Sequence, residues 1–216
     1  MDTKIEKRFI NVGNSKTFRN IVSTFSLDKK SVLDIGCSYG EFLAHFGEGS
    51  RGFTVSRDEE REGQKRGLDV RFQNIEEYQG ETDKTFDVIF ANNILEHMQS
   101  PHNFLLKIKK FLRPGGILIL GVPCIPKLTG LLHLKKFRGS MASLHINFFT
   151  RDTLTKTAEF AGWKVSATRG FRFKNWLVDS MLNLIYPHFY VIAEVNGDFT
   201  YAPKRLKELE GYMEVI

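Results

Sequence analysis

A short apolar run that ends in an acid and passes into a glycine-containing turn constrains the fold of this chain most. Residues 31–43 read SVLDIGCSYGEFL, with Asp34 near the end of the run and Gly36 and Gly40 in the turn. Such a run indicates a buried strand, and glycine lets the backbone take a positive φ or lie against a ligand. A helix beginning at Glu41 would direct unpaired N–H groups toward the same point. The segment therefore predicts a strand, a ligand-binding loop and a helix in succession.

Three kinds of site use a turn of this type. A dinucleotide-binding loop reads G-x-G-x-x-G, but Ser38 and Glu41 stand at its second and third glycines. Gly36-x-Ser38-x-Gly40 also spells a hydrolase nucleophile elbow, which needs an oxyanion loop from an earlier strand, and little chain precedes this one. A nucleoside-binding loop instead requires an acid two residues before the first glycine, and Asp34 meets that requirement.

Length and composition favour one globular domain. The chain has 216 residues, of which 42% are hydrophobic and 26% charged, so it is long enough for a single sizeable core. The net charge of +6 permits an anionic substrate without requiring one. The two cysteines, Cys37 and Cys124, form neither a disulfide framework nor a metal site alone, so we expect a reducing, cytoplasmic location. We expect no signal peptide and no transmembrane segment.

Strands and helices are predicted to alternate along the chain. Strands are expected at residues 32–35, 52–55, 70–72, 86–91, 117–122, 163–168 and 189–195, and helices at 16–26, 41–46, 59–66, 102–112 and 150–161. The run 117–122 is continuously apolar, which is typical of a strand covered on both faces. This alternation predicts an α/β fold, a Rossmann-like doubly wound and mostly parallel seven-stranded sheet with helices on both faces.

The domain organisation follows from the same pattern. Residues 1–196 are expected to form one domain that opens on a helical segment at 1–30, and residues 197–216 a tail with one short charged helix. Residues 125–143 interrupt the alternation after the fifth strand, where insertions lie over the ligand crevice of a parallel sheet. We consider a lid over an anionic substrate, a solvated helix that caps the sheet, and a membrane-docking face. The basic residues of this insertion are Lys127, Lys135, Lys136 and Arg138.

The turn at 34–40 resembles motif I of class I S-adenosylmethionine (SAM) dependent methyltransferases, D-x-G-x-G-x-G, with Ser38 at the middle glycine. Further runs resemble the family at matching intervals. They are the fourth-strand segment 87–98 with its Leu-Glu-His at 95–97, the turn LRPGG at 112–116, the stretch HINFFT at 145–150 and AGWKV at 161–165. The resemblance extends from Ser31 to Val195 and implies a small-molecule methyltransferase of the methyltransferase-11/23-like type.

The resemblance implies where the cofactor SAM would be held. Thr54 stands where the family usually has an acid for the ribose hydroxyls, and Glu59 matches the residue that assists in cyclopropane-fatty-acid-synthase-type enzymes. Asn74 replaces an acid that contacts the adenine amino group, and Asn92 would lie near the methionine part. Glu59 could equally be an exposed helix charge and Asn74 a turn residue. The implied cofactor-binding set is Asp34, Gly36, Cys37, Ser38, Gly40, Thr54, Val55, Glu59, Asn74, Ile75 and Asn92.

Transfer of a methyl group to a hydroxyl oxygen benefits from a base that removes the proton, and histidine suits that task at neutral pH. His145 lies after the insertion and His97 after the fourth strand, so they are the catalytic candidates in that order. Either histidine could instead hydrogen-bond the backbone and shape the pocket. No metal-ligand cluster of the catechol O-methyltransferase kind is visible in the sequence, so we expect no metal.

The acceptor is expected to be a small molecule, sugar-linked or another metabolite, methylated on a hydroxyl. The run Asn92-Asn93-Ile94-Leu95 lacks the prolines of enzymes that methylate exocyclic nitrogens. A nucleic-acid methyltransferase is an alternative, but the basic residues are scattered and no RNA-binding module is visible, so no nucleic acid is expected. A non-catalytic SAM-binding protein remains a further alternative. A serine hydrolase would use Ser38 with His145 or His188 as base.

Overall fold

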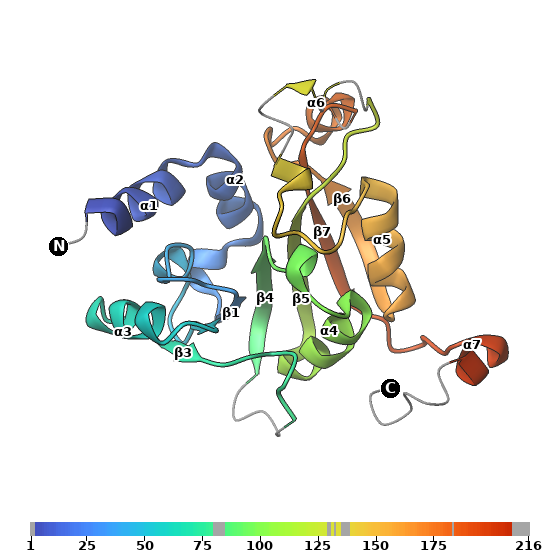
Figure 1. The fold of residues 1–216 in the computed structure, drawn as a ribbon, viewed down its shortest axis with the longest axis horizontal. Helices are drawn as coiled ribbons and strands as arrows, with labels where there is room; N and C mark the ends of the chain where they lie inside the picture. The colour runs from blue at the N-terminus through green and yellow to red at the C-terminus, as the bar shows by residue number, and fades with distance from the viewer. Residues whose placement is uncertain are drawn as a thin grey trace.

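A seven-stranded sheet forms the centre of the protein (Figure 1). The computed structural model describes residues 3–79, 85–128, 131, 133–134, 139–182 and 184–208. The strand order is β3-β2-β1-β4-β5-β7-β6. The pairs among β1 to β5 are parallel, and β7 runs antiparallel to both β5 and β6. The strands are β1 (Val32–Ile35), β2 (Arg51–Thr54), β3 (Val70–Phe72), β4 (Phe86–Asn92), β5 (Leu112–Pro123), β6 (Trp163–Arg169) and β7 (His188–Val195). The predicted strands and the mostly parallel Rossmann-like fold are confirmed.

Helices cover both faces of this sheet (Figure 1). Phe18 and Ile21 of α2 pack with Phe90 of β4 in one apolar cluster. Phe104 of α4 and Leu154 of α5 belong to a second cluster on the other face. Burying each such side chain stabilises the fold by about 1.5–3 kcal/mol. The helices are α1 (Thr3–Asn14), α2 (Lys16–Phe25), α3 (Arg57–Lys65), α4 (Pro101–Ile108), α5 (Arg151–Phe160), α6 (Trp176–Met181) and α7 (Pro203–Glu208), with short 3₁₀ turns η1 (Leu27–Lys29), η2 (Leu43–His45), η3 (Leu95–His97) and η4 (Lys109–Phe111).

The helix starts follow capping side chains. The hydroxyls of Ser15, Ser56, Ser100 and Thr150 each accept a backbone N–H from the first turn of the helix that follows. A cap of this kind stabilises a helix by about 1 kcal/mol. This is why α3 begins at Arg57 and α4 at Pro101, slightly before the positions that apolar spacing predicted.

The predicted helix at 41–46 is wrong. After β1 the chain forms a series of turns and then only the 3₁₀ helix η2. Gly40 has φ of 92°, and a Cβ at Gly47 would lie 2.6 Å from the backbone nitrogen of Lys30. The Ala44 N–H donates to the Gly40 carbonyl over 3.0 Å, but this single α-type bond is not continued, because both glycines fix a tight return toward β2. The loop therefore meets a ligand with its own backbone and side chains, without the N–H groups of an α-helix end.

The insertion after β5 is anchored at its two ends. Cys124 forms a parallel β-bridge with Phe149, and the Ile125 N–H donates to the Phe149 carbonyl over 2.7 Å. Of the four basic residues predicted in the insertion, Lys127 lies 3.6 Å from the Asp152 carboxylate. The other three, Lys135, Lys136 and Arg138, lie outside the described residues.

The segment after β7 packs against the helices on the second face. His102 of α4 shares a 2.8 Å hydrogen bond with the Tyr201 hydroxyl, just before α7. This short helix lies where the sequence predicted one. In the parts of the chain that the structure describes, no helix is long and apolar enough to cross a membrane.

Candidate active site

A cavity of about 480 Å³ opens at the carboxyl ends of the first four strands, within the size range of small-molecule sites. The strand order explains its position, because parallel neighbours end at the same edge and the order reverses between β1 and β4. Seven predicted cofactor-binding residues line it: Gly36, Ser38, Thr54, Val55, Glu59, Asn74 and Ile75. Four others, Asp34, Cys37, Gly40 and Asn92, are not on its wall.

The loop after β1 adopts a left-handed backbone at alternate residues. Gly36, Ser38 and Gly40 have φ of 79°, 50° and 92°. The N–H groups of Gly36 and Cys37 both donate to the Phe53 carbonyl, over 2.9 and 3.0 Å, and this pins the loop to β2. The left-handed region costs an L-residue about 1–2 kcal/mol, so the usual glycine at the Ser38 position has a conformational reason.

The Ser38 hydroxyl offsets that cost through hydrogen bonds. It donates to Glu59 Oε1 over 2.8 Å and accepts from the Arg8 guanidinium over 3.0 Å. The Thr54 hydroxyl donates to the other oxygen of the same carboxylate. Ser38 and Thr54 thus hold Glu59 at the cavity wall from two sides. The carboxylate at this part of the wall therefore comes from α3, while the end of β2 supplies a hydroxyl.

Two buried oxygens near this loop have no hydrogen-bond partner among the described residues, one on Asp34 and one on Asn92. Burial, and then the neighbouring carboxylate of Glu41, raise the pKa of Asp34 well above its usual value. Glu41 itself is buried and pairs with Arg8 from α1. A buried acceptor without a donor is costly, so these oxygens suit a ligand that brings N–H or O–H groups.

The rest of the cavity combines apolar faces with one polar turn. Val55, Ile75, Ile94 and Met98 provide the apolar surface. The Asn74 side chain accepts the Glu76 N–H over 3.0 Å, so it is a turn residue as well as part of the wall. The turn role of Asn74 is therefore observed, and a second lone pair and the amide donors remain available on the cavity wall.

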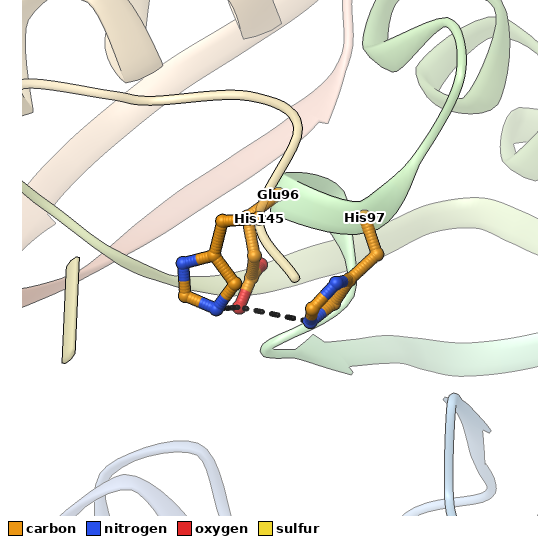
Figure 2. Close-up of side chains that lie close together, drawn as sticks. All are labelled: Glu96, His97 and His145. Carbon is orange, nitrogen blue, oxygen red and sulfur yellow. Dashed lines mark ion pairs between the residues drawn. The ribbon is translucent and has the colours of Figure 1, made fainter. Parts of the chain in front are cut away.

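Glu96, His97 and His145 converge beside this cavity (Figure 2). The Nε2 atoms of both histidines lie 3.9 Å from Glu96 Oε1, and the two rings meet edge to face at 4.9 Å between centroids. Glu96 is 1% exposed, the His145 side chain 10% and the His97 side chain 36%. His97 also lines the cavity. The structure thus brings the two predicted catalytic histidines together, around a buried carboxylate to which the sequence had assigned no role.

Backbone hydrogen bonds hold this arrangement. The N–H groups of Ile146 and Asn147 both donate to the Glu96 carbonyl over 3.0 Å, and the Asn147 amide donates to the Met98 carbonyl over 2.6 Å. The Nδ1 atom of His97 lies 3.1 Å from the Leu144 carbonyl. Residues 144–147 are therefore fixed against the turn that follows β4.

Several contributors could not be found from the sequence. Arg8 comes from a helix that no motif marks, and Glu41 was expected to begin a helix. Glu96 lies within the Leu-Glu-His run, which was a signal without an assigned role. The further wall residues that we did not predict are Ile35, Phe53, Gln73, Glu76, Ile94 and Met98.

The hydrolase alternative lacks its geometry. The Ser38 hydroxyl is bonded to Glu59 and Arg8, and neither is a histidine. His188, at the start of β7, shares a 2.9 Å hydrogen bond with Asn93 instead. No serine–histidine pair is formed at this loop among the residues that the structure describes.

The sheet order and the cavity define a nucleoside-binding α/β protein of the methyltransferase type. The family model described as a methyltransferase domain matches residues 13–168. Because this match covers most of the chain, the protein belongs to that family.

Curated relatives and solved structures agree with this assignment. The ubiquinone biosynthesis O-methyltransferase of Aeromonas salmonicida is 27% identical over 73% of this chain and 77% of that enzyme. The tRNA U34 carboxymethyltransferase of Pseudoalteromonas translucida is 33% identical over 44% of this chain, a match that spans only 32% of that enzyme. A SAM-dependent methyltransferase from Thermotoga maritima superimposes with a TM-score of 0.62 at 19% identity, over 88% of this chain and 94% of that one, and shares the fold.

The protein is therefore a SAM-dependent methyltransferase, and the residues of the cavity fit this cofactor. SAM carries an ammonium group, ribose hydroxyls and a flat adenine ring. On the cavity wall, Glu59 offers two acceptor oxygens for the ribose hydroxyls and the apolar side chains suit the adenine ring. The unpartnered oxygens of Asp34 and Asn92 are buried and are not on that wall.

The Glu59 network generates a prediction for cofactor affinity. Glu59→Ala removes the carboxylate at the cavity wall, and hydrogen bonds to charged groups contribute about 1.5–3 kcal/mol. We expect the Kd for SAM to rise about 10- to 100-fold in titration calorimetry. Asp58→Ala, on the same helix but exposed, is the matched control and should leave the Kd unchanged. A folded Glu59→Ala variant that binds SAM like the wild type would contradict the assignment.

His188 generates a prediction for stability against pH. Burial lowers its pKa to about 4, and its Nδ1 is buried without a partner among the described residues. Below a pH of about 6.5, His188 is protonated in the unfolded chain. In the folded chain it stays neutral until the pH approaches 4. The stability that His188 contributes is thus complete above that pH and is lost as the pH falls toward 4.

We expect the free energy of unfolding to fall by about 1–2 kcal/mol more between pH 7 and pH 5 in the wild type than in His188→Gln. Glutamine keeps a hydrogen-bonding group beside Asn93 but does not titrate. Urea unfolding at several pH values measures the difference. Parallel curves for the two proteins would show that His188 is protonated equally in both states.

Proposed function

We propose that this protein transfers the methyl group of SAM to a hydroxyl oxygen of a small-molecule acceptor, such as a sugar-linked compound or another metabolite. The observation that carries the proposal is the convergence of His145 and His97 on Glu96 at the edge of the cofactor cavity. A hydroxyl must lose its proton as its oxygen is methylated, and histidine nitrogens in this position can take part in that step.

The residues divide into two groups by task. The loop from Asp34 to Gly40, together with Thr54, Glu59, Asn74 and Asn92, would hold and orient the cofactor. SAM supplies, when bound, a methyl group made reactive by its attachment to a sulfonium. Beyond binding, the protein contributes alignment and closeness, which account for much of the rate enhancement of a displacement reaction.

His145 is the first candidate for the acceptor side, and His97 the second. The Leu144 carbonyl accepts from His97 Nδ1, which leaves His97 Nε2 with a lone pair directed toward Glu96. His145 faces the same carboxylate and is more enclosed. Enclosure excludes water from the acceptor hydroxyl and strengthens its interaction with the histidine.

A relative supports oxygen as the acceptor atom, since the enzyme of Aeromonas salmonicida is named as an O-methyltransferase. A second candidate, RNA as the substrate, is favoured by the likeness to a tRNA enzyme and by the net charge of +6. That likeness covers 44% of this chain, whereas the likeness to the O-methyltransferase covers 73%. We therefore place the small-molecule acceptor first.

The test of the function uses SAM with a labelled methyl group and two pools of acceptors, a hydroxyl-rich metabolite extract and total RNA. We expect label to enter small molecules as an acid-stable and base-stable methyl ether. Label in RNA alone would favour the second candidate. Calorimetric binding of SAM without transfer to either pool would favour a non-catalytic binding protein.

The role of His145 is tested by His145→Ala. We expect the methylation rate to fall by about 10²- to 10⁴-fold, while the Kd for SAM stays nearly unchanged because His145 is not part of the cofactor wall. His102→Ala, at the far side of α4, is the matched control and should keep the wild-type rate. Equal rates in the wild type and in His145→Ala would remove this residue from the mechanism.

A further inference from the structure

The carboxylate of Glu96 is buried and has no hydrogen-bond partner among the described residues. The residue is 1% exposed. The nearest nitrogens, on His97 and His145, are 3.9 Å away, which is beyond hydrogen-bonding distance. A carboxylate removed from water without a partner is unfavourable, so a cation bound at this point would compensate the charged form of Glu96.

The histidine tautomers indicate what kind of group would fit. His97 Nδ1 lies 3.1 Å from the Leu144 carbonyl, and since a carbonyl only accepts, this nitrogen carries the hydrogen. In the neutral ring, His97 Nε2 then carries no hydrogen, so its lone pair is available for an ion beside Glu96. The Nε2 atom of His145 faces the same oxygen. A second ring nitrogen fixed by a backbone carbonyl is the usual support of a metal-bound histidine.

We propose that Glu96, His97 and His145 bind one divalent transition-metal cation of the Zn²⁺ or Mn²⁺ class. One ligand atom from each residue lies within 4.8 Å of the others, and Figure 2 shows the three side chains directed toward a common point. Two nitrogens and a carboxylate oxygen are a donor set for these ions. Tetrahedral ligands of zinc lie about 3.4 Å apart, so the three side chains need only draw together by small rotations.

The backbone positions these ligands before any ion binds. The Glu96 carbonyl accepts the N–H groups of Ile146 and Asn147, and the Asn147 amide bonds to Met98. The two ligand-bearing segments, far apart in the sequence, are thereby held together without the metal. A preformed site spends less free energy on ordering its ligands than one that forms on binding.

The site leaves coordination positions open. Three protein ligands are the arrangement of catalytic rather than structural zinc sites, in which water or substrate occupies the remaining position. His97 belongs both to this site and to the wall of the cofactor cavity. A cation here would bind the oxygen of an acceptor and lower the pKa of its hydroxyl, so that the proton leaves to water more readily. This last step rests on the proposed methyl transfer to a hydroxyl, and in it the ion replaces the histidines as the means of removing the proton. Metal binding itself does not depend on that function.

The inference departs from the expectation that no metal takes part. That expectation came from the absence of a recognisable ligand pattern in the sequence, and Glu96 and His97 are separated from His145 by the whole of β5 and the insertion. Among the described residues, Glu96, His97 and His145 form the one group of three histidine, cysteine or acidic side chains close enough to bind the same ion.

The experiment measures metal binding by the whole protein, without a methylation assay. Protein treated with a chelator and then freed of it is titrated with ZnCl₂ in a calorimeter, and with MnCl₂ under electron paramagnetic resonance. We expect one equivalent of ion to bind. Glu96→Gln and His145→Ala should each weaken that binding at least about tenfold, and Glu159→Gln and His102→Ala, outside the cluster, should not.

Folding of each variant is checked by its circular dichroism spectrum and its melting temperature, which should stay near the wild-type values. If Glu96→Gln fails this check, His145→Ala and His97→Ala decide the question. No binding of either ion by the wild type, or binding that none of the cluster variants weakens, overturns the inference. Binding of the ion by a protein that methylates no hydroxyl would uphold the metal site and reject only the proposed acceptor.

Discussion

The Phe53 carbonyl accepts two backbone N–H groups from the turn after β1, and this bifurcated contact fixes the geometry of the cofactor side. It presses Gly36 and Cys37 onto the end of β2, so that Ser38 must follow in a left-handed conformation. Ser38 then reaches Glu59, and Thr54 reaches the same carboxylate from the neighbouring strand. One backbone contact therefore determines which side chains meet at the cavity wall.

Two departures from the family pattern, Ser38 and Thr54, act on the same side chain. Ser38 in place of glycine and Thr54 in place of an acid each supply a hydroxyl to Glu59. A carboxylate still reaches the cavity, but it comes from α3 and is held by two donors rather than by its own strand. Each departure taken alone weakens the resemblance to a cofactor loop, whereas together they hold one carboxylate at the cavity wall.

Features of the fold that depend on interactions between residues close in the sequence could be predicted from it. The strands and the order of elements follow from apolar runs, glycines and caps within short stretches. The wall residues from Gly36 to Ile75 were implied by the resemblance of short motifs to the methyltransferase family. The predicted helix at 41–46 failed because the close approach of Gly47 to Lys30 is a tertiary contact. Arg8 and the grouping of Glu96 with His145 depend on which distant segments meet, and no spacing in the sequence encodes that. The acceptor side was therefore less predictable than the cofactor side.

The β-bridge between Cys124 and Phe149 holds the two ends of the insertion side by side, so the insertion forms a loop with fixed ends. Residues 144–147 are in addition tied to the turn after β4. Changes of length or composition between Cys124 and residues 144–147 are consequently expected to leave the spacing of His145 from Glu96 unchanged. The place of His145 beside Glu96 is thus set by contacts at the two ends of the insertion and does not depend on how many residues lie between them.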